Sequence, residues 1–230
     1  MKKSMRKNTD AVSPVVGVML MLSVTVILAA VVSAYAGGTV MPAQKAPSGT
    51  FECKIVNGGT WDNSGFTINV LSVSEPIPTK DVKLTTSWRA SDGTTDTVVT
   101  TGPPGKTTTC YYWGYKYHVP LGYGPNIDWD PSELYKVDQF YGNYSLFAGT
   151  TLYASPCGAN TTTGGYGVTP ETRYEYSHTG HYSSGGYTDP MRAVLGRNWN
   201  NLRPGDRVNV KLVHLPTGTL LFEKNVAVEA

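Results

Sequence analysis

Side chains with the chemistry of catalysis are few in this 230-residue chain, and their spacing brings no nucleophile next to a base. His178 and His181 have a spacing found in metal sites, but a glycine lies between them and no cysteine is near, which favours surface-loop residues. The sequence contains no Gly-x-Ser-x-Gly, no His-Glu-x-x-His and no phosphate-binding loop. We therefore expect no catalytic residue, no cofactor, no metal and no enzyme activity.

Amide and acidic side chains alternate at Asn126, Asp128 and Asp130, as in the first half of a calcium-binding loop. Pro131 stands where the EF-hand motif needs glycine, so a structural cation is the alternative here and not the first choice. The favoured interpretation is that Asp130 caps a short helix over roughly 131–139, with Pro131 in its first turn.

The three cysteines fall in two different settings. Cys53 shares a strand face with Phe51 and Ile55, so we expect it to be buried as a thiol. Cys110 and Cys157 bracket a region rich in tyrosine and glycine, where a disulfide would restrain a long loop. We expect these two to pair.

That region, at about 111–187, holds 14 of the 15 tyrosines. Tyrosine rings suit protein interfaces and sugar contacts, and they also fill small cores, so both interpretations stay open. Asn143 and Asn160 begin the sequons Asn-Tyr-Ser and Asn-Thr-Thr in expected surface loops. Both are candidates for N-glycosylation.

The formal net charge of +2 comes from the first ten residues, which hold Lys2, Lys3, Arg6 and Lys7 and a single acid. Without them the chain has 15 basic and 16 acidic residues. No basic excess is left to neutralise a phosphate backbone, so we do not expect nucleic acid as a partner.

Residues 11–44 contain no charged side chain, and Val15 to Ala36 are almost wholly apolar. A helix of this length is about 33 Å long, enough to cross the hydrocarbon layer of a bilayer, and Gly37-Gly38 should end it. The preceding basic residues keep the N-terminus in the cytoplasm and send the remainder outside. A secretory signal peptide is the alternative, disfavoured because the apolar run is long and no convincing cleavage site follows it.

The stretch Ala11-Val-Ser-Pro-Val-Val-Gly-Val, together with Thr25-Val-Ile-Leu-Ala-Ala-Val-Val, resembles the N-terminal segment of archaeal type IV pilins over about residues 6–37. The resemblance implies a short basic leader that a membrane-embedded prepilin peptidase removes. It also implies assembly with the N-terminal helices in a central bundle and β-rich heads outside. Asp10-Ala11, a charged residue followed by a small one at the edge of the apolar run, places the cleavage between Ala11 and Val12.

The apolar segment also carries small residues that permit close contact between helices. Ala29 and Ser33 lie one helical turn apart, and so do Ala30 and Ala34. The expected helix-packing residues are Gly17, Ala29, Ala30, Ser33 and Ala34.

From residue 51 onward, apolar and polar side chains alternate, and turn signals at Ser91-Asp92-Gly93 and Pro216-Thr217-Gly218 predict two hairpins. The expected fold is a long N-terminal hydrophobic α-helix plus a mainly antiparallel β-sandwich head, Ig-like or pilin-like, with a Tyr/Gly-rich insertion. The expected domains are the leader 1–11, the helix 12–38, a neck linker 39–50, and the extracellular head 51–230 with the insertion at about 111–187.

The resemblance implies a structural function: a pilin of an archaeal type IV pilus-like surface filament that polymerises through its helix and serves adhesion. Its implied partners are further copies in a helical homopolymer, the prepilin peptidase, the pilus assembly platform, the membrane before assembly, and surface glycans. The implied location is a membrane-anchored precursor and then a filament on the cell surface. The alternative is a membrane-anchored extracellular binding protein, for carbohydrate or adhesion, that does not polymerise.

Overall fold

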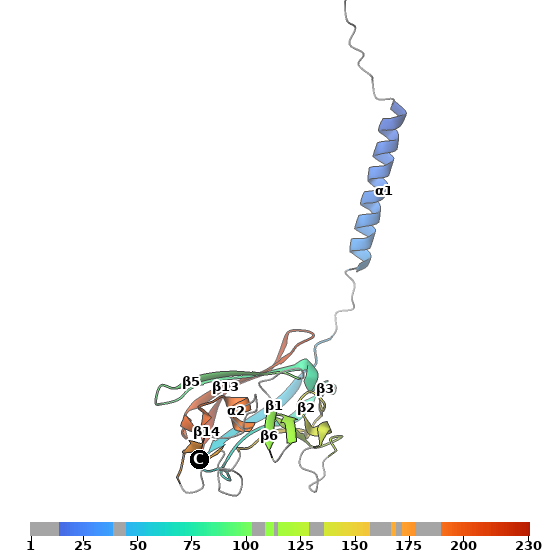
Figure 1. The fold of residues 1–230 in the computed structure, drawn as a ribbon. Helices are drawn as coiled ribbons and strands as arrows, with labels where there is room; N and C mark the ends of the chain where they lie inside the picture. The colour runs from blue at the N-terminus through green and yellow to red at the C-terminus, as the bar shows by residue number, and fades with distance from the viewer. Residues whose placement is uncertain are drawn as a thin grey trace, which may run out of the picture. The chain divides into compact units, whose positions relative to one another are not determined.

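The computed structural model describes residues 14–38, 45–102, 109–112, 115–128, 136–156, 167–168, 172–177 and 190–230. The chain divides into two compact units, Met1–Lys45 and Ala46–Ala230. The first, which we call the helical unit, contains helix α1 (Pro14–Gly38), and the second, the β unit, contains the described strands (Figure 1).

Helix α1 has the limits that its sequence predicts within the described residues. Pro14 is tolerated at its start because a first-turn amide has no partner within the helix. The helix ends at Gly38, the second residue of the glycine pair. Residues 12–13 of the predicted helix and residues 39–44 of the predicted neck lie outside the described residues.

The β unit is built on one sheet of eight strands, in the order β5-β4-β13-β14-β1-β2-β10-β8. Pairs β3–β9, β6–β7 and β11–β12 form small two-stranded ladders. The strands of the main sheet are β1 (Gly49–Asn57), β2 (Ser64–Val73), β4 (Val82–Arg89), β5 (Thr95–Thr100), β8 (Leu121–Tyr123), β10 (Thr151–Ala154), β13 (Arg207–His214) and β14 (Thr219–Glu229). Those of the ladders are β3 (Ile77–Pro78), β6 (Thr109–Tyr112), β7 (Tyr115–His118), β9 (Ser145–Leu146), β11 (Gly167–Val168) and β12 (Tyr176–Ser177).

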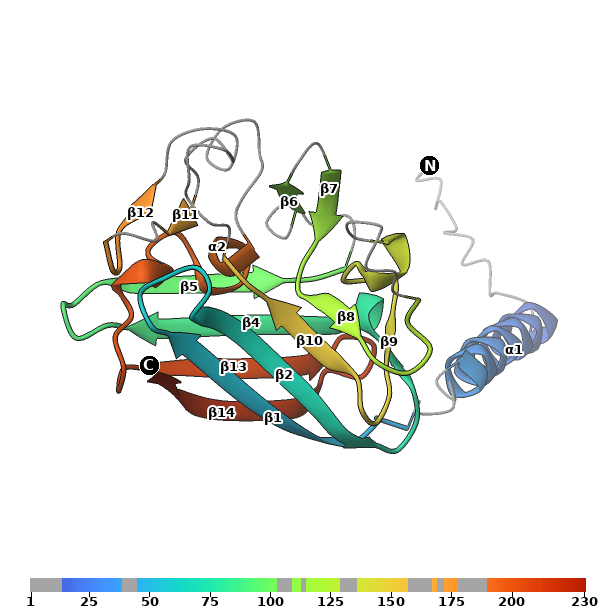
Figure 2. The same cartoon turned by 90° about the horizontal axis from the view of Figure 1, so that it is seen from below.

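The main sheet is antiparallel except where β1 meets β14, which run parallel with Ile55 opposite Val228. Figure 2 shows β5, β4, β13 and β14 side by side, with β1, β2 and β10 running at an angle to them. The sheet therefore curls, and the two layers expected of a sandwich are the two halves of one continuous sheet. The predicted fold class, a long apolar helix followed by a mainly antiparallel β-rich domain, is confirmed.

Alternation along the strands builds the core of the β unit. On β1, Phe51, Cys53 and Ile55 are buried while Glu52 and Lys54 between them are exposed. Strands β2, β4 and β13 alternate in the same way. The two predicted hairpins are present, and Gly93 and Gly218 adopt the positive φ angles that their turns require.

A short helix, α2 (Pro190–Leu195), packs against β4 and β5 and also against β2 and β10. The last carbonyls of a helix lack partners within it, and here β4 supplies them. Trp88 Nε1 donates a hydrogen bond of 2.7 Å to the Leu195 carbonyl, and Thr86 Oγ1 donates to that of Val194. The sheet thus fixes α2 through polar as well as apolar contacts.

The middle of the predicted insertion belongs to the sheet and its core, which corrects the expectation that 111–187 merely elaborates the head. Strands β8 and β10 extend the main sheet beyond β2. Tyr141 and Tyr144 are buried; their hydroxyls donate to the carbonyls of Val82, at 3.1 Å, and Pro120, at 2.8 Å. Because β10 pairs with β2 and Tyr141 bonds to Val82 of β4, the described residues between 119 and 156 are integral to the fold.

The prediction of a helix over roughly 131–139 is wrong for its C-terminal end, residues 136–139. Lys136 is extended, with φ −69° and ψ 146°, and only Val137–Gln139 form a single 3-10 turn. Residues 129–135, which include the expected cap Asp130, lie outside the described residues.

Candidate functional site

Helix α1 is the candidate site because its side chains find no partner within their own unit. All of the large apolar side chains described on it are exposed, from 46% for Val16 to 73% for Met21. They surround the helix on every side, so it has no polar face that water would prefer. A helix of this kind needs surroundings that are apolar all round.

Two of the hydroxyl groups on α1, those of Ser23 and Thr25, are hydrogen-bonded inside the helix. Ser23 Oγ donates to the Met19 carbonyl, and Thr25 Oγ1 donates to that of Leu22 at 2.9 Å. Such bonds to the preceding turn let a hydroxyl lie in an apolar medium. Among the described residues, Pro14–Ser33 is long and apolar enough to cross a membrane, with a mean hydropathy of 2.8.

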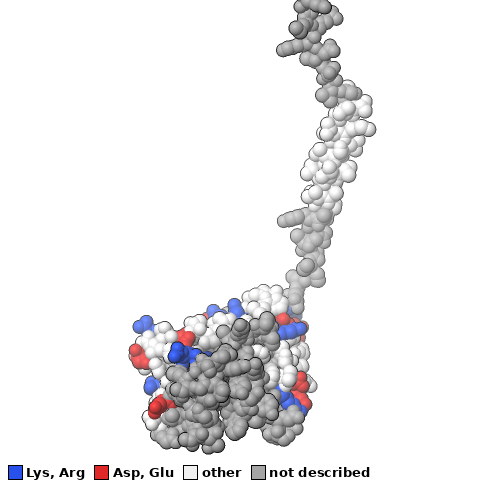
Figure 3. All heavy atoms as spheres, in the orientation of Figure 1, with Lys and Arg blue, Asp and Glu red and all other residues white. Residues whose placement is uncertain are grey.

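Charge distinguishes helix α1 from the β unit. Figure 3 shows basic and acidic side chains scattered over the β unit and none on the described part of α1. Two of the described ion pairs, Lys54–Glu229 at 2.9 Å and Lys211–Glu223 at 3.1 Å, join neighbouring strands on the sheet surface. The β unit therefore suits water, whereas α1 does not.

The predicted helix-packing residues all lie in α1. Gly17, Ala29, Ala30 and Ser33 are exposed, and a Cβ at Gly17 would have nothing within 4 Å. Ala34 lies one turn beyond Ala30, but its side chain is outside what the structure describes. At 3.6 residues per turn, Gly17 faces roughly the opposite side from the other small residues. The small residues thus leave room for a neighbouring helix on two sides of α1.

Several predicted sites fall wholly or partly outside the described residues. This holds for the cleavage residues Ala11 and Val12, for Asn160, and for the histidine pair. Cys110 lies in β6, but its side chain is not described and Cys157 lies outside, so the predicted disulfide stays a prediction.

Asn143, the other predicted glycosylation site, is exposed. Its side-chain amide donates a hydrogen bond of 2.8 Å to the carbonyl of Val137. Glycosylation at Asn143 would therefore have to replace or rotate this bond, while the exposed position leaves room for a sugar.

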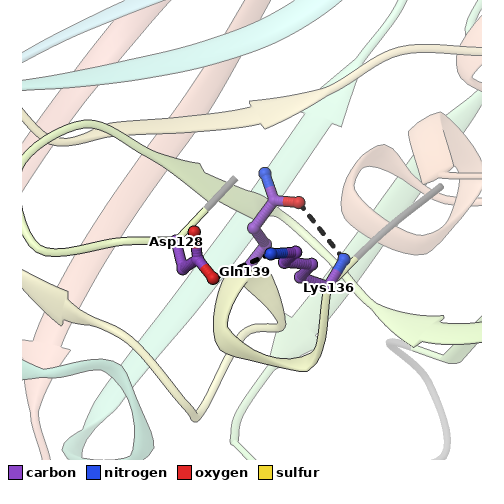
Figure 4. A network of polar contacts seen from close by, with 3 residues as sticks. All are labelled: Asp128, Lys136 and Gln139. Atoms are coloured by element: carbon purple, nitrogen blue, oxygen red, sulfur yellow. Dashed lines mark hydrogen bonds and ion pairs between the residues drawn. The ribbon is translucent and has the colours of Figure 1, made fainter. Parts of the chain in front are cut away.

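The carboxylate of Asp128, a candidate cation ligand, forms an ion pair with a lysine. Lys136 Nζ lies 2.8 Å from Asp128 Oδ2, and the Lys136 backbone N–H donates to Gln139 Oε1 at 3.4 Å (Figure 4). Gln139 Nε2 in turn donates to the Gly122 carbonyl of β8. Across the described part of the chain, no three His, Cys, Asp or Glu side chains gather as metal ligands would. The ammonium group already supplies the positive charge next to Asp128.

Cys53 is buried as predicted. Burial raises the pKa of its thiol from 9.0 to about 12, against a smaller lowering by the charge of Lys224. A thiol held in its neutral form is a poor nucleophile, so Cys53 is a core residue.

The tyrosines with described side chains divide between two roles. Tyr141 and Tyr144 fill the core, whereas Tyr123 and Tyr153 meet edge to face, 6.1 Å apart, in half-buried positions. They border a small cavity with no carboxylate, imidazole or thiol in its lining. Tyr141 and Tyr144 thus confirm the core-filling interpretation, whereas a role for tyrosines in protein or sugar contacts stays a prediction.

Comparison with known protein families gave a match to the N-terminal part of the chain. Residues 10–51 match the family model described as archaeal type IV pilin, N-terminal. The match covers α1 and the first residues of β1. Comparison with curated proteins gave no match, and comparison with solved structures gave none either. The resemblance found in the sequence is confirmed over residues 10–51, which match the N-terminal segment of archaeal type IV pilins.

Proposed function

We propose that the chain is a structural subunit of an archaeal type IV pilus-like filament, in which α1 packs among the helices of further copies. The observation that carries the proposal is the exposure of α1 on every side, together with the pilin match over the same residues. Full burial of a large apolar side chain is worth about 1.5–3 kcal/mol. The valines, leucines, isoleucine and methionines of α1 are 46–73% exposed, so they represent on the order of 10–20 kcal/mol that lipid or other helices can recover.

Before assembly, α1 anchors the precursor in the membrane with its N-terminus in the cytoplasm. A prepilin peptidase cuts between Ala11 and Val12, which leaves the apolar helix on the mature protein. The assembly platform then transfers α1 from lipid to a bundle of identical helices. Exchange of one apolar surrounding for another avoids the free-energy cost of exposing the helix to water.

The β unit is the part that the filament presents outside. Its surface carries dispersed charges, and Asn143 and Asn160 offer positions for N-linked glycans. In this proposal, the β units mediate adhesion, including contact with surface glycans, and the Cys110–Cys157 disulfide restrains the tyrosine-rich loops. This assigns polymerisation to the helical unit and recognition to the β unit.

The proposal is tested on filaments sheared from the cell surface. Mass spectrometry of the purified filaments should identify this chain as a subunit, and N-terminal sequencing should begin at Val12. An intact Met1, or a start after Ala36, would contradict the processing step. Recovery of the chain from membranes alone, with none in the filament fraction, would support the anchored binding protein instead.

A further inference from the structure

Asn57 and Gly58 lie at the end of β1 and form the sole Asn-Gly pair in the sequence. Asn-Gly is a chemically unstable pair, because glycine has no side chain to hinder attack of its backbone nitrogen on the preceding side-chain amide. The structure holds this pair in a conformation that opposes the reaction.

Asn57 is 2% exposed, and both polar atoms of its side-chain amide are hydrogen-bonded. Nδ2 donates to the Leu202 carbonyl at 2.9 Å and, over a longer distance of 3.5 Å, to that of Trp199. Oδ1 accepts hydrogen bonds of 3.2 Å from the Gly59 N–H and from Ser64 Oγ. Rotation of the side chain toward the backbone would break these bonds in a site from which water is excluded.

The attacking atom is restrained as well. The Gly58 N–H donates a hydrogen bond of 2.7 Å to the Asn63 carbonyl, across the turn between β1 and β2. To attack Asn57, this nitrogen must lose both its proton and that partner. Both reacting groups are therefore held in place until the turn opens.

The fold needs both residues of the pair, which explains why so reactive a sequence stands here. A Cβ at Gly58 would lie 2.1 Å from Asn63 Nδ2 and 2.8 Å from the Asn63 carbonyl oxygen. An aspartate at 57 would turn an acceptor toward the Leu202 carbonyl and would bury a negative charge. Neither residue can be exchanged for a more stable neighbour without loss of the turn.

We infer that Asn57-Gly58 is a deamidation site that the native fold protects and that unfolding exposes, so that reaction there commits the subunit to remain unfolded. In the open chain, the Gly58 nitrogen bonds to Cγ of Asn57, and the side-chain nitrogen leaves as ammonia. Water then opens the five-membered succinimide at either carbonyl and yields aspartate or isoaspartate. The sum is hydrolysis of one amide, with water as the other reactant.

Neither product can restore the native contacts. Aspartate lacks the N–H donors that reach Leu202 and Trp199, and isoaspartate adds a methylene to the backbone at the end of β1. In a subunit proposed to work outside the cell, the modification would accumulate in chains that have unfolded and not in chains that have stayed folded.

The test uses the full chain in detergent at mildly alkaline pH, with one sample native and one in urea. Peptide mapping by mass spectrometry follows aspartate and isoaspartate at position 57, and a synthetic peptide of residues 54–61 gives the unprotected rate. The urea sample should react at the rate of the peptide, and the native sample at least about 100-fold more slowly, because the turn must first open. Equal rates in the native and urea samples would overturn the protection.

The second half of the inference is tested by diluting the urea sample after increasing times. Folded and unfolded chains are separated by size-exclusion chromatography, and each fraction is mapped. Modified chains should collect in the unfolded fraction, and the refolding yield should fall as modification rises. Modified chains that refold with an unchanged unfolding midpoint would contradict the inference. The same chain kept in urea for equal times at mildly acidic pH, where the Gly58 nitrogen keeps its proton and cyclisation is slow, is the matched control for losses in urea that do not involve this pair.

Discussion

The helical unit and the β unit differ in whether their apolar side chains are shielded from water within the unit. In the β unit, Phe66, Ile68 and Leu152 have no exposed surface, because both halves of the curled sheet and α2 cover them. In α1, Leu22 and Leu28, which are equally apolar, remain 59% and 58% exposed. The β unit thus contains its own stabilising contacts, whereas α1 depends on what surrounds it.

This difference separates the effects expected from substitutions in the two units. A change inside the β unit alters the free energy of folding, and a change on α1 alters only what the helix contacts outside its unit. The small residues on two sides of α1 fit several neighbours better than a single partner. The comparison therefore predicts that folding and assembly can be damaged separately.

The largest expected effect compares a truncation in each unit. Phe66→Ala should lower the free energy of unfolding of the β unit by about 3–5 kcal/mol, because it leaves a cavity between the sheet halves. Leu22→Ala should change it by less than about 0.5 kcal/mol. Urea unfolding followed by fluorescence of the buried Trp88 and Trp199 measures both. Comparable losses from the two variants would mean that the units fold as one.

A smaller effect tests whether the region between 119 and 156 is integral to the β unit. Tyr141→Phe removes the hydroxyl that bonds the Val82 carbonyl and should cost about 1–2 kcal/mol of unfolding free energy. Tyr153→Phe, at a half-buried surface position, is the matched control and should cost under about 0.5 kcal/mol. If Tyr141→Phe proves as mild as the control in urea unfolding, this region is an appendage after all.

The smallest effect concerns Cys53 and alkaline pH. The pKa of its thiol is about 12 in the folded chain against 9.0 ordinarily, so the unfolded state loses this proton first. The contribution of the neutral thiol to the free energy of unfolding is therefore complete below about pH 8.5. It falls as the pH rises, by up to about 1.4 kcal/mol for each pH unit. Unfolding measured between pH 8 and about pH 10 should show this slope, and Cys53→Ala should show a shallower one, to which buried tyrosines such as Tyr141 still contribute. Identical slopes would place the thiol in contact with water.

Much of this architecture could be predicted because its signals are local. The apolar run fixes α1, and strict alternation marks β1, β2, β4 and β13 without any tertiary information. The turns at Gly93 and Gly218 require the conformations that glycine adopts most easily. The segment that matches the pilin family could be predicted for the same reason, because an uncharged apolar helix is recognisable from its own sequence.

The remainder depends on contacts between distant residues. Strands β8 and β10 are three and four residues long, too short for alternation to show, and Gly122 interrupts the first of them. Helix α2 buries all but one of its residues, so it has no amphipathic period. The parallel pairing of β1 with β14 joins the two ends of the β unit. Asn57-Gly58 is a typical turn sequence, but the bonds that hold the Asn57 side chain reach carbonyls more than 140 residues away, which local sequence does not indicate.

The central claim, that α1 is a surface for packing against other copies, is tested most directly by Ala30→Leu. Leucine is more apolar than alanine, so membrane insertion should be unchanged, whereas its bulk should prevent close helix approach and abolish or sharply reduce filaments. Val31→Leu, at an exposed position that is already large, is the matched control and should assemble normally. Filaments counted by negative-stain microscopy, with membrane fractionation of the same cells, give both readouts. Normal filaments from Ala30→Leu, and also from Ala29→Leu, would contradict the claim.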